Sequence, residues 1–355
     1  MKFFYKNFPF VLLLLTGCYS LFGPKTNITV GFVLEISPGS SSEKLKEILH
    51  ERLLNSGFYQ ENIKIESSRN MLELTLDNYD STETPFKELR KLLTAAGELE
   101  FWETYENSEI IPFLAKADSA LASFFAKENP MLGSSANHID TSSVMQMLLT
   151  SPESSAISIE KYMSEHPLFF ILAPSVDQQG RVTPGPVIGR SNIKDTARVM
   201  SHFRNEKIKD ILPENVKFAW TNKPLQGTDS VMQLVALKVT RRDGKAALCG
   251  NMITDARKEY SQQTANPHIS MTMNDEAAQV WTQLTEDNIG KSIAIVFDGQ
   301  VFSYPIVQGK IEAGVSQITG DFTSTEAETI VSVLKAGMLT GSVKIKGETI
   351  LLKEK

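Results

Sequence analysis

The sequence predicts an α+β protein with two subdomains, and three observations support this prediction. Residues 28–104 alternate strand-like runs with two helical patterns in the order βαββαβ. A second mixed pattern begins near residue 231, where an alternating strand at 269–273 precedes a helix and a hairpin. The chain has 355 residues, of which 41% are hydrophobic, so it holds enough apolar material for two cores.

The first subdomain is expected at residues 27–107. Its predicted elements are, in order, a strand at 28–36, a helix at 40–57, strands at 63–66 and 71–76, a helix at 85–97 and a strand at 98–104. Ser40 and Thr84 are residue types that cap helix starts, and Gly57 and Gly97 suit helix ends. The order βαββαβ is that of a ferredoxin-like fold, so we expect the strand at 98–104 to be its fourth strand.

Residues 108–230 are expected to connect the two subdomains. Apolar residues at helical spacing predict a helix at 109–127, whereas the serine-rich stretch at 133–158 predicts a flexible insertion with some helix around 144–149. A strand is predicted from residue 168, followed by a helix near 194–212 and a strand at 216–220. We interpret these as connecting elements rather than as a third subdomain.

A hairpin is the clearest local feature of the second subdomain, which is expected at residues 231–341. An apolar run at 292–297 stops at Asp298 and Gly299, a dipeptide that tolerates the positive φ angles of a type I′ turn. The return strand is expected to end near Tyr304 and Pro305, because proline cannot donate a hydrogen bond to a sheet. These four residues are therefore predicted to be structural, and a hairpin corner explains Asp298 better than a catalytic carboxylate does.

A helix is predicted to end the second subdomain. Thr323 and Glu326 have the spacing of a capping box, apolar residues then recur at helical spacing, and Gly337 suits the end of the helix. On an earlier helix, Trp281 is expected to be a core residue rather than a platform for a ligand. Residues 342–355 are expected to form a C-terminal tail.

The amino terminus has the pattern of a lipoprotein signal peptide. Lys2 and Lys6 precede a short apolar run at 8–15, which is too short to span a membrane comfortably. Residues 15–18 resemble the lipobox of bacterial lipoproteins, which implies that Cys18 carries lipid. Residues 1–18 are then the signal peptide and 19–26 a tether. The alternative is an uncleaved anchor with an incidental cysteine.

Charge and cysteine content exclude several classes of function. Removal of the signal peptide changes the formal net charge from −6 to about −8, so neither nucleic-acid binding nor a preference for anionic lipids is expected. If Cys18 is lipidated, Cys249 has no partner for a disulfide or a cysteine-based zinc site. We interpret Cys249 as a small, partly buried residue.

No pattern typical of an enzyme is present in the sequence. The five histidines are dispersed, and there is no His-Glu-x-x-His, no glycine-rich phosphate loop and no Gly-x-Ser-x-Gly. The chain is therefore expected to be a non-enzyme without a cofactor or a metal.

A series of short motifs resembles one known family. The matching segments fall in the same order and spacing as in SecD and fused SecDF protein-export proteins, and they lie at 31–36, 99–107, 236–239, 253–257, 270–274, 288–291, 295–299 and 317–323. The resemblance is to the first periplasmic domain of that family, and it implies a ferredoxin-like base and an α+β head. No stretch after Cys18 approaches the about 18 apolar residues of a spanning helix, so we expect no proton channel in this chain.

The resemblance implies a lipid-anchored protein on the periplasmic side of the bacterial cell envelope. Such a protein is expected to assist Sec-dependent translocation by transiently binding unfolded secretory polypeptide, and to associate with the Sec translocon. Two alternatives stay open at this point. One is an envelope assembly or structural lipoprotein that uses the same fold to bind a folded partner, and the other is an inert remnant of a truncated gene.

Overall fold

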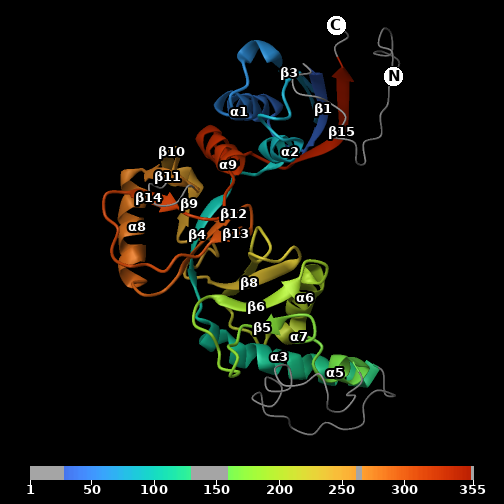
Figure 1. Cartoon of the computed structure of the whole chain (residues 1–355), viewed down its shortest axis with the longest axis vertical. Coiled ribbons are helices and arrows are strands. Elements are labelled where there is room, and N and C mark those ends of the chain that lie inside the picture. Colours follow the sequence, from blue (N-terminus) through green and yellow to red (C-terminus); the bar gives the residue numbers. More distant parts are fainter. Residues whose placement is uncertain (1–27, 129–158, 261–265, 353–355) are drawn as a thin grey trace. The chain divides into compact units, whose positions relative to one another are not determined.

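The computed structural model describes residues 28–128, 159–260 and 266–352, and its backbone divides into two units (Figure 1). Unit 1 holds the described residues of 1–97, 256–267 and 321–355, and unit 2 holds those of 98–255 and 268–320. Both units combine helices with antiparallel strands, so the predicted α+β fold class is confirmed. Cys18 and the predicted insertion at 133–158, with its helix around 144–149, lie outside the described residues.

Unit 1 is a four-stranded antiparallel sheet with three helices. Its strands are β1 (Ile28–Ile36), β2 (Ile63–Ser68), β3 (Met71–Tyr79) and β15 (Val343–Leu352), in the order β15-β1-β3-β2. Its helices are α1 (Ser42–Asn55), α2 (Phe86–Thr94) and α9 (Ser324–Ala336). Val30, Phe32 and Leu34 alternate along β1 as buried residues, so one face of the sheet forms the core. Helix α9 packs against both α1 and α2.

The fourth strand of this fold is not the one that the sequence predicted. Strand β4 (Leu99–Thr104) forms as expected, but it lies in the large sheet of unit 2. Its place is taken by β15, from residues expected to be a tail, which pairs with β1 from Ile28↔Leu352 to Ile36↔Val343. Five of the six residues of β4 are buried, which suits a strand inside a sheet, whereas β15 alternates buried or half-buried with exposed residues at an edge.

The predicted helix starts are correct to within one or two residues. The N-cap of α1 is Ser41 instead of Ser40, and Pro85 rather than Thr84 precedes α2. The capping box of α9 forms as predicted, with Thr323 and Glu326 each accepting a hydrogen bond from the other's backbone amide. Gly337 ends this helix with a φ angle of 86°.

A buried arginine joins the ends of two helices in unit 1. The side chain of Arg52, on α1, is 0% exposed. Its Nη1 atom donates to the carbonyl oxygens of Leu92 and Ala95 at 3.2 and 2.6 Å, at the end of α2. Its Nη2 atom donates to Ala96 and to Gly337, after α9, at 3.3 and 3.0 Å. Helix ends leave carbonyl groups without intrahelical partners, and this guanidinium supplies donors to them.

Unit 2 contains a large sheet, whose strands differ in length, and most of a smaller one. The large sheet has the order β13-β12-β4-β8-β6-β5, with β7 on β8 and β9 on β4. Its remaining strands are β5 (Ala173–Pro174), β6 (Val187–Asn192), β7 (Val216–Trp220), β8 (Val231–Lys238), β9 (Leu248–Cys249), β12 (Ile293–Phe297) and β13 (Gln300–Ser303). The smaller sheet has the order β10-β11-β14, with β10 (Ile253–Tyr260), β11 (Pro267–Met273) and β14 (Val315–Ile318), and β10 belongs to unit 1 from Ala256 onward. The helices are α3 (Asn107–Glu128), α5 (Ile159–Glu165), α6 (Thr196–Arg204), α7 (Glu206–Lys209) and α8 (Asp275–Asp287).

The strand predicted from residue 168 is wrong, because the chain turns there. The Oδ1 atom of Asp118, a buried residue of α3, accepts the amides of Leu168 and Phe169 at 2.9 and 3.2 Å. Its Oδ2 atom lies 2.8 Å from Nδ1 of His166. These bonds hold residues 166–172 in a hydrogen-bonded turn that leads to the short strand β5.

No helix within the described ranges has both the length and the apolar character required to cross a membrane.

Candidate functional site

The predicted hairpin is present between β12 and β13 of unit 2. Asp298 and Gly299 have φ angles of 49° and 77°, the positive values that a type I′ turn requires. A Cβ atom at Gly299 would meet nothing within 4 Å, so the backbone angle, not crowding, favours glycine here. The side chain of Asp298 accepts the amide of Glu98 at 2.8 Å, and its own amide donates to the Glu98 carbonyl at 2.9 Å. The turn is thereby bonded to the residue that precedes β4.

Tyr304 and Pro305 hold the chain where it leaves the hairpin. The Tyr304 hydroxyl donates to Oε1 of Gln233, on β8, at 3.2 Å. The carbonyl of Pro305 accepts the amide of Ile293 at 3.1 Å. Both bonds position the segment that follows.

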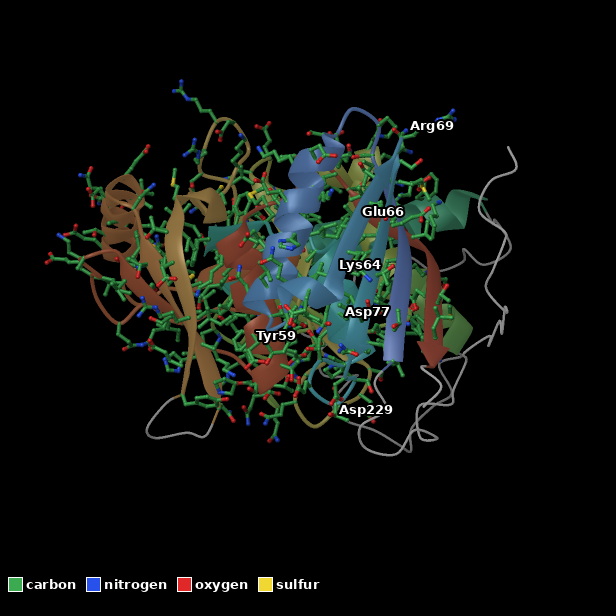
Figure 2. The ribbon with its side chains drawn as sticks, turned by 90° about the horizontal axis from the view of Figure 1, so that it is seen from above. Tyr59, Lys64, Glu66, Arg69, Asp77 and Asp229 are labelled. Carbon is green, nitrogen blue, oxygen red and sulfur yellow. The ribbon has the colours of Figure 1, made fainter. Side chains whose placement is uncertain are left out.

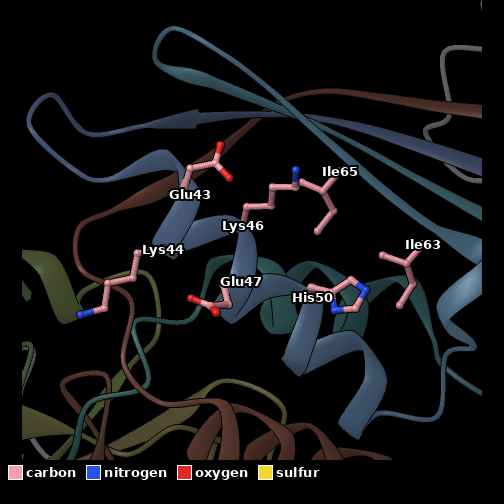
Figure 3. A pocket seen from close by; sticks show the side chains of 7 residues that line it. All are labelled: Glu43, Lys44, Lys46, Glu47, His50, Ile63 and Ile65. Carbon is pink, nitrogen blue, oxygen red and sulfur yellow. The ribbon is translucent and has the colours of Figure 1, made fainter.

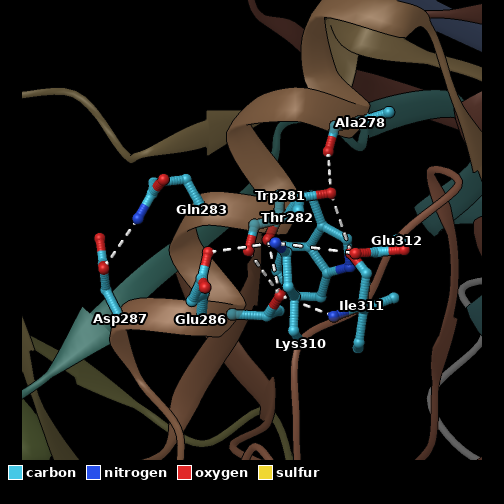
Figure 4. Close-up of polar contacts among 10 residues, drawn as sticks. Ala278, Trp281, Thr282, Gln283, Glu286, Asp287, Lys310, Ile311 and Glu312 are labelled. Carbon is cyan, nitrogen blue, oxygen red and sulfur yellow. Dashed lines mark hydrogen bonds and ion pairs between the residues drawn. The ribbon is translucent and has the colours of Figure 1, made fainter.

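That segment, residues 306–314, is a strap that lies along α8 (Figure 4). The Thr282 hydroxyl donates to the carbonyl of Ile311, whose amide donates to the Thr285 hydroxyl, each at 3.0 Å. Lys310 Nζ lies 3.3 Å from Glu286 and 3.6 Å from Glu312, and the hydrogen bond to Glu286 and its charge raise the pKa of Lys310. The strap is therefore held to the helix mainly by polar contacts.

Three aliphatic side chains beside the ends of the strap are exposed. Ile289 follows α8 and is 53% exposed, Ile306 begins the strap and is 57% exposed, and Val315 begins β14 and is 50% exposed. A hydrogen bond of 2.9 Å from Gly290 to Val307 holds the first two segments side by side. Strand β14 is also the last strand of its sheet in the described part of the chain. Val315 follows Gly314, whose carbonyl accepts the Met273 amide just before α8, whereas Ile289 follows the end of α8, so the exposed side chains form two patches, one beside each end of this helix. We refer to these two patches, with the outer edge of β14, as the head surface.

The head surface suits the binding of extended chain rather than covalent chemistry. An edge strand offers backbone donors and acceptors to an added strand, and this form of recognition tolerates many sequences. Exposed aliphatic side chains gain free energy when apolar groups cover them, at about 25 cal/mol per Å². Sequence reasoning did not identify these three residues. The available signal was an aliphatic residue next to a turn, outside any helical or alternating pattern.

A hollow lies in unit 1 between α1 and β2 (Figure 3). It is a shallow depression of about 700 Å³ lined by Glu43, Lys44, Lys46, Glu47, His50, Ile63 and Ile65. Figure 2 shows Lys64 and Glu66 along β2, where Lys64 forms an ion pair of 3.0 Å with Asp77. Charged groups of both signs surround the depression, so its charge pattern favours no one class of ligand.

Cys249 and the Asp118–His166 pair are ionisable groups outside the head surface, and their contacts stabilise the fold. Cys249 is half-buried on β9, and burial, with the charges of Glu100 and Glu98, raises the pKa of its thiol. A thiol of this kind is a poor nucleophile. The Asp118–His166 pair, from residues 48 positions apart, fixes the turn at 166–172. Within the described ranges, no group of three or more His, Cys, Asp or Glu side chains is placed to hold a metal ion.

Comparison with known proteins identifies a family over part of the chain. Residues 230–341 match the family described as SecDF, P1 head subdomain. The chain is 38% identical over 180 residues to the protein translocase subunit SecD of Rhodothermus marinus, which covers 51% of this chain and 27% of that protein. It is also 34% identical over 122 residues to SecD of Dictyoglomus turgidum, and this match covers 34% of the present chain and 30% of that protein. The chain thus spans less than a third of the length of these relatives.

Solved structures of SecDF are also similar to this chain. The crystal structure of SecDF in its super-membrane-facing form has a TM-score of 0.45 and 16% identity, over 92% of this chain and 30% of that one. The structure of a membrane component SecDF that enhances protein export has a TM-score of 0.42 and 17% identity, and the match covers 89% of this chain and 98% of that one.

Proposed function

We propose that this chain, which is similar to SecD and matches the SecDF P1 head subdomain over residues 230–341, assists protein export by reversibly binding extended polypeptide. The proposal places the protein on the periplasmic side of the cell envelope, in association with the Sec translocon. It assigns no catalytic step and no cofactor to the chain.

The head surface is the observation that supports this proposal. Ile289, Ile306 and Val315 all lie within the range matched to the head subdomain, and each has at least half of its surface exposed. An extended segment can add to the outer edge of β14 through main-chain hydrogen bonds while its apolar side chains cover Val315. Binding of this kind depends little on sequence, as a protein that handles many exported chains requires.

The test of the proposal is a titration with unfolded polypeptide. A fluorescently labelled, permanently unfolded secretory protein should bind the full chain weakly, in the micromolar range, because holding must be reversible. The variant Ile306→Ser/Val315→Ser should weaken binding about tenfold, since it removes one aliphatic contact at each end of the strap. Fluorescence anisotropy measures both values.

The matched control for this titration is Ile193→Ser. Ile193 lies in the same unit and is 50% exposed, but it is outside the matched head range. It should leave peptide affinity unchanged. Equal affinities for all three proteins, or tight binding of one folded envelope protein together with no binding of unfolded chain, would reject the proposal in favour of an assembly role.

We also propose that Cys18 is the point of lipid attachment. Its thiol is the only atom of the lipobox-like segment that can carry the thioether, so Cys18→Ser should block processing and leave a larger precursor without incorporated fatty acid. Metabolic labelling with a radioactive fatty acid, followed by mass analysis, measures this. Cys249→Ser serves as the control and should be labelled normally. An unchanged mass and label in Cys18→Ser would contradict the assignment.

A further inference from the structure

Helix α6 of unit 2 and the segment before it, from the end of β6, carry cations that have no carboxylate partners. Residues 190–204 contain Arg190, Lys194, Arg198 and Arg204, and a single carboxylate, Asp195. All four cations are exposed, and none lies within 4 Å of a carboxylate among the described residues. Elsewhere many exposed cations are paired, as Arg181 is with Asp177 at 2.7 Å and Arg241 with Asp243 at 2.9 Å. We refer to the four cations and Ile193 as the α6 patch.

The cations of α6 lie away from its buried side, with Lys194 in the turn before the helix and Arg190 on β6. Val199 and Phe203 are buried beneath α6, whereas Lys194, Arg198 and Ser201 recur at intervals of four and three residues and are exposed. Lys194 precedes the amino-terminal end of α6, where the helix dipole disfavours a positive charge. Lys194 therefore does not stabilise the helix through its charge.

An exposed isoleucine lies within the basic residues. Ile193 is 50% exposed and stands between Arg190 and Lys194 in the chain. Its amide donates to the Ser230 carbonyl at 2.7 Å, and the Lys194 amide donates to the Asn192 side chain at 3.0 Å, so the backbone at this point is held. An apolar side chain flanked by cations is the arrangement by which proteins rest on anionic membrane surfaces.

We propose that the α6 patch docks on an anionic phospholipid surface, with Ile193 entering the interfacial layer. The net charge of −6 predicts no such preference, but charges are screened within about 8 Å at physiological ionic strength, so the local surface decides. Each Lys or Arg near such a surface contributes substantially to binding. A folded acidic partner fits less well, because a stable protein interface covers about 800 Å² per partner, much more than one short helix and its preceding turn.

The nearest charges on the packed elements do not neutralise the patch. Glu206 begins α7, but Lys207 and Lys209 lie on the same short helix. Lys207 also lies 5.0 Å from the Phe124 ring of α3. With Asp210, which caps the end of α7, the charges of residues 206–210 cancel, so α7 leaves the excess positive charge of the α6 patch in place. The inference does not rest on the proposed polypeptide binding.

Cosedimentation with vesicles tests this proposal on the full chain. The chain should bind vesicles of phosphatidylcholine with phosphatidylglycerol more strongly than vesicles of phosphatidylcholine alone, and added salt should release it. Lys194→Glu/Arg198→Glu should lower binding to the anionic vesicles at least about tenfold. Ile193→Ser should lower it severalfold. Residues 1–27 are the same in every variant, so insertion of the amino terminus does not account for a difference.

The control carries the same change in net charge at paired cations of the same unit. Arg181→Glu/Arg241→Glu should bind the anionic vesicles within about twofold of the unchanged chain. Equal losses in the two double variants, or equal binding to both kinds of vesicle, would overturn the proposal. Retention of the chain by polyglutamate, without retention by anionic vesicles, would also overturn it and indicate an acidic protein partner.

Discussion

Replacement of Arg52 by methionine is expected to destabilise unit 1 by at least about 3 kcal/mol. The substitution keeps an unbranched apolar side chain but removes the guanidinium donors to Leu92, Ala95, Ala96 and Gly337, of which Ala96 still accepts the amide of Leu339, and the residue is fully buried. A buried carbonyl that loses its donor costs about 1–3 kcal/mol, because water does not replace it. Arg52→Lys should recover only part of this loss, since an ammonium group lacks the planar fork that reaches both helix ends.

Urea unfolding measures the effect separately in the two units. All three tryptophans, Trp102, Trp220 and Trp281, lie in unit 2, so their fluorescence is an internal reference. Hydrogen exchange at the amides of α1 and α2 reports unit 1. Arg90→Met is the control, because Arg90 is a partly exposed arginine paired with Glu348 at 2.7 Å, and its loss should cost less than about 1 kcal/mol. Equal stability of the two variants would show that the buried guanidinium is not a main support of unit 1.

Removal of residues 342–355 is expected to unfold unit 1. Strand β15 pairs with β1 along its whole length, and its loss leaves the backbone groups on that side of β1 without partners. Each intramolecular hydrogen bond contributes about 0.5–1.5 kcal/mol, and a domain is stable by only about 5–15 kcal/mol in total. The loss of so many bonds, together with the burial of Val343 on β15, is of the order of the whole stability of unit 1.

A shorter truncation provides the comparison for this experiment. Removal of residues 353–355 leaves β15 intact and should not change the stability of unit 1. Hydrogen exchange at the amides of β1 distinguishes the two proteins, and tryptophan fluorescence should show unit 2 folded in both. Protection of β1 that survives the longer truncation would mean that the strand at 98–104, as first predicted, or some other segment, can take the fourth position.

Much of the fold could be predicted because it depends on neighbours in the chain. The capping box of Thr323 and Glu326 joins residues three positions apart, and the turn at Asp298 and Gly299 depends on which backbone angles these two residues tolerate. Strand β1 and helix α3 were predicted because periodic apolar residues show which face is buried. The head hairpin residues of the candidate site were found in the same way, whereas Ile289 and Ile306 were not, because their one local signal, an aliphatic residue beside a turn and outside any periodic pattern, does not show which surface is left uncovered.

The sequence by itself determined the fold class, most elements of the first subdomain, the helices α3 and α9, the head hairpin, and the resemblance to one family. Only the tertiary structure decided which strand completes the sheet of unit 1, where Arg52 donates, and which cations lack partners. The physical reason is distance along the chain. Strand β15 reaches β1 from more than 300 residues away, and Arg52 reaches Gly337 across 285. Which strand pairs with β1 depends on the free energies of all the alternative pairings of buried faces and polar groups in the folded chain. A short stretch of sequence does not contain the residues that decide between these alternatives.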